Sequence, residues 1–98
     1  MTDFIYNAQG RAVGFLRNYF IYTLSGQAVG KVGGTHVYKM NGSYVGELNH
    51  HMVVDKHLGS LANIGASINP GNPGSPGAPT GRAAQSFGYR DVFASLLS

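Results

Sequence analysis

The residues best suited to chemistry lie close together in the middle of the chain. His50 and His51 are adjacent, His57 follows, and the carboxylates of Glu47 and Asp55 are near in sequence. Imidazole and carboxylate groups are ligands for zinc or nickel, but adjacent residues on a strand point to opposite faces, so His50 and His51 cannot easily share one ion. The spacing matches no recognised metal motif. The pattern favours solvated connector residues over a metal site, and we expect no cofactor.

Three tyrosines at a constant spacing of sixteen residues, Tyr6, Tyr22 and Tyr38, form the second candidate site. If they are equivalent by repeat, they form three quarters of a ring around a shared axis. Phenol rings in such a ring could stack on a sugar, a base or a cation. Strands are also rich in Tyr for packing reasons alone. The pattern favours tyrosines in the core, with ligand binding as the alternative.

Signatures of catalysis and of nucleic-acid binding are missing from the sequence. It contains no Gly-x-Ser-x-Gly elbow, paired-carboxylate motif or phosphate loop, and Lys31 does not end a Gly-rich turn ahead of a helix. Seven Lys or Arg against four Asp or Glu leave a formal charge of +3, and the basic residues are scattered singly. Scattered charge steers partners weakly and leaves no nucleic-acid footprint. We therefore expect a protein that is not an enzyme and does not bind nucleic acid.

The tyrosines belong to a pattern that repeats every sixteen residues, which indicates repeated structure. The four copies begin at Phe4, Phe20, His36 and Met52. Each copy starts with three residues of high β-propensity, reaches a glycine, and continues three residues later with an apolar residue. The fourth copy is imperfect, because Val54 replaces Tyr and Gly59 stands one residue late. His36 holds the position of a phenylalanine in the first two copies and is expected to pack.

The glycines predict a β-hairpin in each copy. Gly10, Gly26 and Gly42 follow short polar segments, as in a type I turn that closes in a left-handed glycine with a bulge. In the returning strand, Val13 and Leu16 are three residues apart, which on a regular strand places them on opposite faces. The glycine after each Val favours a bulge or bend that returns both to one core. The alternative is a strand buried on both faces.

Four such hairpins must share a core or pair their edges, since one hairpin alone is marginal in water. Sixteen residues are too few for a propeller blade of about 40. We predict an all-β domain over residues 1–66, with four β-hairpin repeats around a pseudo-four-fold axis. The pattern Tyr-x-x-x-Gly-x-x-Val-Gly at residues 6–14, 22–30 and 38–46 resembles the four-fold beta flower family of small bacterial domains, over residues 4–66. The spacing is also similar to YD-repeat shells and MORN-type arrays. The beta flower resemblance implies a fold and no activity.

The rest of the chain, residues 67–98, is predicted to be an extended linker followed by a short C-terminal helix. Three Gly-x-Pro triplets in residues 70–79 are too few for a triple helix and favour an extended Gly/Pro-rich linker. Beyond them, Val92, Phe93, Leu96 and Leu97 fall on one helical face, and Asp91 can cap the first turn. So short a helix needs a surface to cover. Its own domain, a second copy and another protein are all candidates, and the first two are favoured because a core of about 60 residues is thin.

Composition completes the expectations. The 98 residues suffice for one domain, and without cysteine the fold uses no disulfide. The start lacks a basic region followed by an apolar run, and no apolar stretch approaches the length of a membrane span, so we expect a soluble cytoplasmic protein. The expected function is a small structural or protein-interaction module that forms a homo-oligomer or binds a protein partner. The alternative is a domain that binds a sugar or nucleotide-like ligand on a Tyr-lined axis.

Overall fold

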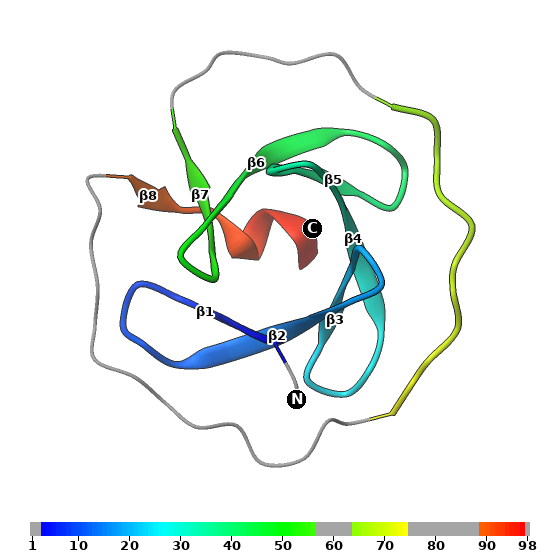
Figure 1. The fold of residues 1–98 in the computed structure, drawn as a ribbon, viewed down its shortest axis with the longest axis horizontal. Coiled ribbons are helices and arrows are strands. Elements are labelled where there is room, and N and C mark those ends of the chain that lie inside the picture. Colours follow the sequence, from blue (N-terminus) through cyan, green and yellow to red (C-terminus); the bar gives the residue numbers. More distant parts are fainter. Residues whose placement is uncertain (1–2, 57–63, 75–88, 98) are drawn as a thin grey trace.

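Short antiparallel strands, each paired with the next along the chain, build one curled sheet. The computed structural model describes residues 3–56, 64–74 and 89–97. Within these ranges the elements are β1 (Asp3–Tyr6), β2 (Ala12–Arg17), β3 (Phe20–Thr23), β4 (Ala28–Gly33), β5 (His36–Lys39), β6 (Tyr44–Asn49), β7 (Met52–Asp55), β8 (Arg90–Asp91) and the 3₁₀-helix η1 (Phe93–Leu97). The strands follow the order β1 to β8 in the sheet and surround η1 (Figure 1). The all-β prediction is confirmed.

Each of the first three repeats turns back at its glycine. The backbone N–H of Gly10 donates to the carbonyl of Asn7 at 3.0 Å, and Gly26 and Gly42 make the same bond to the residue three positions earlier. Their φ angles are 82°, 94° and 93°, in the left-handed region that glycine enters without a Cβ clash. The predicted turn is confirmed.

A β-bulge follows each turn, also as predicted. Ile5 pairs with Gly14 but Tyr6 pairs with Ala12, so Val13 is the extra residue. The same shift occurs between β3 and β4 and between β5 and β6. The bulge rotates the strand, so that Val13 and Leu16 both pack on one hydrophobic cluster.

The fourth hairpin is built from two distant parts of the chain. β7 pairs with β8, with Val54 opposite Asp91 and Asp55 opposite Arg90. In the third repeat, the equivalent of Val54 is Tyr38, which pairs with the returning strand of its own hairpin. β8 lies within residues 67–98, which we expected to form only a linker and a short helix packing on the repeat domain or a partner, and it is instead part of the sheet of that domain. Gly59, the late glycine of the imperfect fourth copy, lies outside the described residues.

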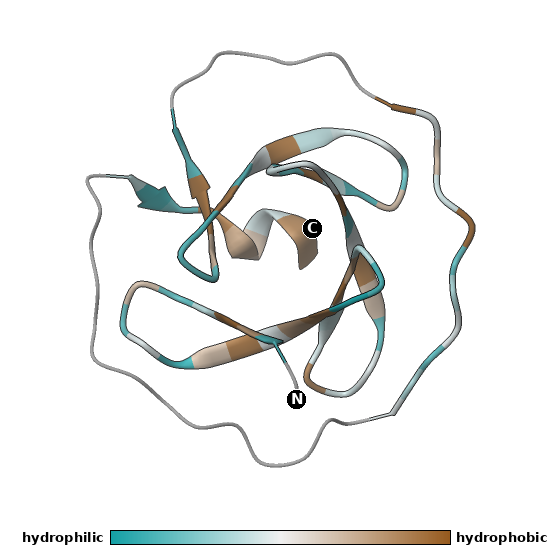
Figure 2. Cartoon of the chain, viewed as in Figure 1, coloured by the Kyte–Doolittle hydropathy of each residue, from teal (hydrophilic) through white to brown (hydrophobic). Residues whose placement is uncertain are grey.

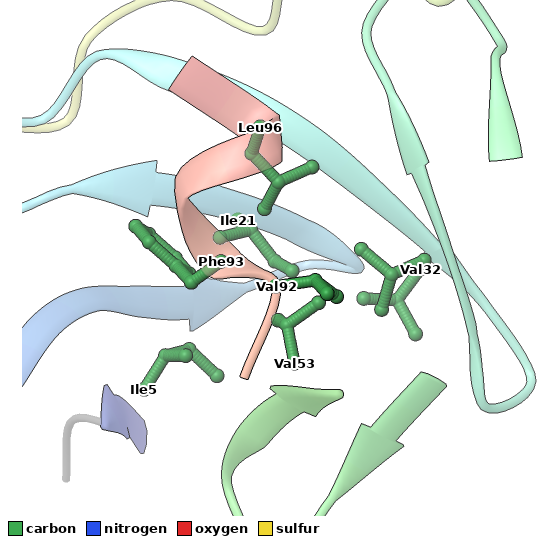
Figure 3. Packing of buried hydrophobic residues seen from close by; sticks show 8 residues of the cluster. Ile5, Ile21, Val32, Val53, Val92, Phe93 and Leu96 are labelled. Carbon is green, nitrogen blue, oxygen red and sulfur yellow. The ribbon is translucent and has the colours of Figure 1, made fainter. Parts of the chain in front are cut away.

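The core lies on the axis of the sheet. Its buried members, called here the central cluster, are Ile5, Ile21, Val32, Val37, Val53, Val92, Phe93 and Leu96. The middle residue of the first strand of every repeat belongs to it, together with three residues of the C-terminal segment (Figure 3). In the hydropathy colouring, η1 includes brown residues and further brown residues lie along the strands around it (Figure 2). η1 has five residues, and no helix in the described ranges is long and apolar enough to cross a membrane.

A backbone hydrogen bond joins the first strand to the turn that precedes β7. The carbonyl of His51, in the turn before β7, accepts the N–H of Tyr6 in β1 at 2.7 Å. At the equivalent position of the second repeat, the carbonyl of Tyr19 accepts the N–H of Val32 from its own hairpin. The N–H of Tyr6 therefore takes the place that a residue of a returning strand holds elsewhere, and β1 lies next to β7.

Candidate functional site

The C-terminal segment packs along the axis of the molecule. The glycines of the repeats leave the space for its side chains, and this space is called here the axial seat. A Cβ atom on Gly14 would lie 3.0 Å from Cζ of Phe93. On Gly30 it would lie 3.1 Å from Cδ2 of Leu96, and on Gly46 it would lie 3.0 Å from Cγ2 of Val92. Each of the three well-preserved hairpins thus accepts one apolar side chain of the C-terminal segment, in the space that a larger residue would fill (Figure 3).

Asp91 fixes this segment at its entry. Its Oδ1 accepts the backbone N–H of Phe93 at 3.1 Å, which caps η1 as the sequence predicts. Its Oδ2 accepts the backbone N–H of Ala8, also at 3.1 Å, in the turn of the first hairpin. One carboxylate therefore starts the helix and ties the end of the chain to its beginning.

The four apolar residues that the sequence groups as interaction residues separate in the structure. Val92, Phe93 and Leu96 are buried in the central cluster, so they hold the chain together internally. Leu97 is 58% exposed and is left for contacts outside the chain.

Two open hollows flank Leu97. The larger, of about 430 Å³, lies between the first two hairpins, and its apolar lining includes Val13, Leu24, Phe93 and Ala94. The other, of about 360 Å³, lies between the second and third hairpins and is lined in part by Val29, Met40 and Leu96. Leu97 belongs to both linings. The apolar side chain of Leu97, at the end of η1, thus projects between the two hollows.

The third hairpin carries a buried carboxylate that sequence reasoning treated only as a neighbour of the histidines. Glu47 is 3% exposed. Its Oε1 accepts a hydrogen bond from Oγ1 of Thr35 at 2.8 Å, and its Oε2 lies 2.7 Å from Nδ1 of His36 and 2.6 Å from the hydroxyl of Tyr44. Both carboxylate oxygens are therefore satisfied.

The environment perturbs two pKa values in this network. Burial raises the pKa of Glu47, but hydrogen bonds from Tyr44, His36 and Thr35 outweigh it and hold that pKa below its usual value. Burial, followed by the hydrogen bond to Glu47 and its negative charge, raises the pKa of Tyr44 well above the usual range. Glu47 is thus an acceptor, Tyr44 a donor, and Nδ1 of His36 carries the proton shared with Oε2.

The repeat itself marks this network as a departure. The position of Glu47 holds Phe15 in the first repeat and Lys31 in the second. Phe15 stacks on Tyr22 with ring centroids 5.1 Å apart, and Lys31 lies 5.4 Å from the centroid of Phe20. Aligning the repeats would therefore have singled out Glu47. Because the hydroxyls of Thr35 and Tyr44 are both committed to the carboxylate, the arrangement suits internal support better than reaction with a substrate.

The tyrosines do not line the axis. In β3, Ile21 belongs to the central cluster, whereas Tyr22 packs in a second cluster with Phe15 and Ala28 on the other side of the strand. Tyr38 is buried too, in edge contacts with His36 and Tyr44.

The same alternation along β1 places Ile5 on the axis and turns the neighbouring Tyr6 away from it. The favoured interpretation of the tyrosines as core residues holds for Tyr22 and Tyr38, which are buried, but the ring that we expected around the axis is absent because the central cluster fills the axis. The binding alternative based on a Tyr-lined axis therefore has no space there.

His50 and His51 form a tight turn between β6 and β7. Their φ angles are 49° and 64°, as in the two-residue turns of hairpins. We expected them to point to opposite faces of a strand, but they lie in a turn. With Asp3 and the apolar side chains of Ile5, Leu16 and Leu48, they line a hollow of about 270 Å³. Within the described ranges, no three His, Cys, Asp or Glu residues gather in a way that could hold a metal ion. His57, the third proposed ligand, lies outside those ranges.

Comparison with known proteins agrees with this architecture. The family model described as 4-fold beta flower protein matches residues 3–92, a range that includes β8. Searches of curated proteins and of solved structures give no significant match. The chain therefore belongs to the 4-fold beta flower protein family, whose members are small domains without an assigned function.

Proposed function

We propose that this chain is a small non-enzymatic interaction module that self-associates through the face on which η1 ends. The observation that carries the proposal is Leu97, 58% exposed between two hollows that it helps to line. Contiguous exposed apolar patches mark interaction surfaces, whereas single exposed apolar side chains are common, and Leu97 forms such a patch with the hollows beside it.

The face suits a second copy of the same chain. A two-fold contact needs one patch that carries both a projection and the hollow that receives it. Leu97 provides the projection, and the hollow of about 430 Å³ lies directly beside it. Among the described residues that line that hollow, Asp91 is the only charged one, and both its carboxylate oxygens accept hydrogen bonds from within the chain. Little charge therefore opposes burial of the face against its copy.

The non-enzymatic part of the proposal rests on the polar groups. The network around Glu47 is satisfied internally, and the hollow of about 430 Å³ is mainly apolar. Hydroxyl groups do meet a carboxylate in this network, but Glu47 is buried away from any substrate and its lowered pKa makes it a weak base.

The test measures mass by light scattering across a series of micromolar concentrations, with protein that is kept folded throughout. We expect a dimer in equilibrium with monomer, and Leu97→Asp should shift the protein to monomer without changing its circular dichroism. Ile68→Asp is the matched control, because Ile68 is 90% exposed on the linker and lines none of the three hollows described above. A wild-type protein that stays monomeric, or an L97D variant that associates as strongly as wild type, would exclude this function.

A further inference from the structure

The second half of the fourth hairpin comes from a distant part of the chain. Its first strand, β7, follows directly from the third hairpin, but its second strand and the filling of the axis come from residues 89–97, called here the tail segment. The tail segment binds as a peptide ligand would. β8 adds a strand to β7, Val92 donates its N–H to the carbonyl of Val53 at 2.9 Å, and apolar side chains enter the glycine seats.

The connection between β7 and the tail segment is long enough for the tail segment to bind either its own copy or a second copy of the chain. A chain as long as residues 57–88 can reach on the order of 100 Å when extended, whereas the longest dimension of the molecule is 34 Å. The described part of the connection, residues 64–74, touches the body at hairpin turns. Ser67 donates to the carbonyl of Met40 at 2.8 Å, and the side chain of Asn72 donates to the carbonyl of Ser25 at 3.4 Å.

We propose that the tail segment of one copy completes the fourth hairpin and fills the axial seat of a second copy, so that two copies assemble by reciprocal exchange. Every contact that the tail segment makes with the body is available in the second copy, because the seat is identical. This assembly is independent of the Leu97 face, since it requires no contact between the two ends of η1.

Mass action sets when exchange appears. A tethered segment competes as if it were present at an effective concentration of about a millimolar. The folded monomer therefore prevails in dilute solution, and exchanged dimers become comparable when chains fold together near millimolar concentration. Once formed, they persist on dilution, because release requires the axis to open.

The test uses the cysteine-free background. Asp55 and Arg90 face each other across β7 and β8, at the Cα separation that an antiparallel pair offers to a disulfide. Two single variants of the full chain, Asp55→Cys and Arg90→Cys, are made in an L97D background so that the face contact contributes nothing. They are unfolded, mixed, refolded together at high concentration and oxidised, and the 55–90 heterodimer is identified by mass. A yield above that of an unrelated cysteine pair shows that a tail segment lies on the β7 of another copy.

The control pairs Arg90→Cys with Arg17→Cys, an exposed residue at the end of β2. We expect the D55C and R90C mixture to give at least a several-fold higher heterodimer yield than the control, rising with concentration during refolding. Equal yields overturn the exchange while leaving the face contact standing. The double variant D55C/R90C, refolded in dilute solution, should close the bridge within one chain. If it does not, native mass spectrometry of co-refolded labelled and unlabelled L97D protein decides, and absence of mixed dimers overturns the proposal.

Discussion

Gly30 and Leu96 should be energetically coupled, because one gives space to the other. A Cβ on Gly30 would lie 3.1 Å from Cδ2 of Leu96 and 3.0 Å from the carbonyl oxygen of Tyr38. Gly30→Ala alone should therefore cost about 1–3 kcal/mol, as overpacking of a core does. Leu96→Ala alone should cost about 2–5 kcal/mol, since the side chain is buried in the central cluster.

The double variant should cost less than the sum. Shortening Leu96 removes one of the two close contacts of the new methyl group and leaves the backbone contact with Tyr38. About half of the Gly30→Ala cost should be recovered, which gives a coupling free energy of about 1 kcal/mol.

Urea denaturation followed by circular dichroism and tyrosine fluorescence measures all four proteins. Gly33→Ala is the matched control in the same strand, because its Cβ would meet nothing closer than Cε2 of Tyr38 at 3.7 Å. It should change the free energy of unfolding by less than about 0.5 kcal/mol and add independently to Leu96→Ala. If Gly30→Ala and Leu96→Ala also add to within about 0.5 kcal/mol, the tail segment does not seat on that glycine.

Three further variants probe other parts of the fold. The carboxylate of Glu47 has a folded-state pKa below its ordinary value of 4.5, so its contribution to stability is present above that pH and is lost as the pH falls through the folded pKa. Glu47→Gln should therefore lose less stability than wild type between neutral and acidic pH in thermal melts, and an equal loss would contradict the network. Asp91→Ala should cost about 1–2 kcal/mol, since it removes a helix cap and the bond to the first turn; a change below about 0.5 kcal/mol in urea denaturation would show that neither bond matters. Gly42→Ala should destabilise more than Gly34→Ala, although both have positive φ, because a Cβ on Gly42 would meet the backbone of Ile64 whereas one on Gly34 meets nothing within 4 Å. Equal melting temperatures for the two variants would show that the backbone of Ile64 does not pack against the turn at Gly42.

The local features of the fold were predictable because they are set by residues near each other in sequence. The glycine turns and the bulge at Val13 follow from backbone preferences within one repeat, and the structure has both. The partner of β7 could not be read in this way. Nothing near Val54 indicates that Asp91 will lie opposite it, because the pairing satisfies a strand edge that only the assembled sheet exposes.

The candidate site shows the same division. Burial of Glu47 depends on donors from Thr35 and His36 that reach it only in the register of β5 and β6. The tyrosine ring failed for a simpler reason. Strand alternation allows either Ile21 or Tyr22 to face the axis. The choice depends on the C-terminal segment, which fills the axis, and this packing could not be predicted from the repeat alone.

The repeats agree on one side of the hairpins and differ on the other. Toward the axis, all four repeats place a β-branched aliphatic residue in the middle of the first strand, and the first three hairpins follow their bulge with glycine. On the opposite side, one equivalent position holds Phe15, Lys31 and Glu47 in an aromatic stack, a cation–π contact and a carboxylate network. The scaffold thus lets one hairpin change its outward chemistry while its neighbours keep the centre intact. A designer could therefore substitute the position of Phe15, Lys31 and Glu47 in one repeat without changing the residues of the central cluster.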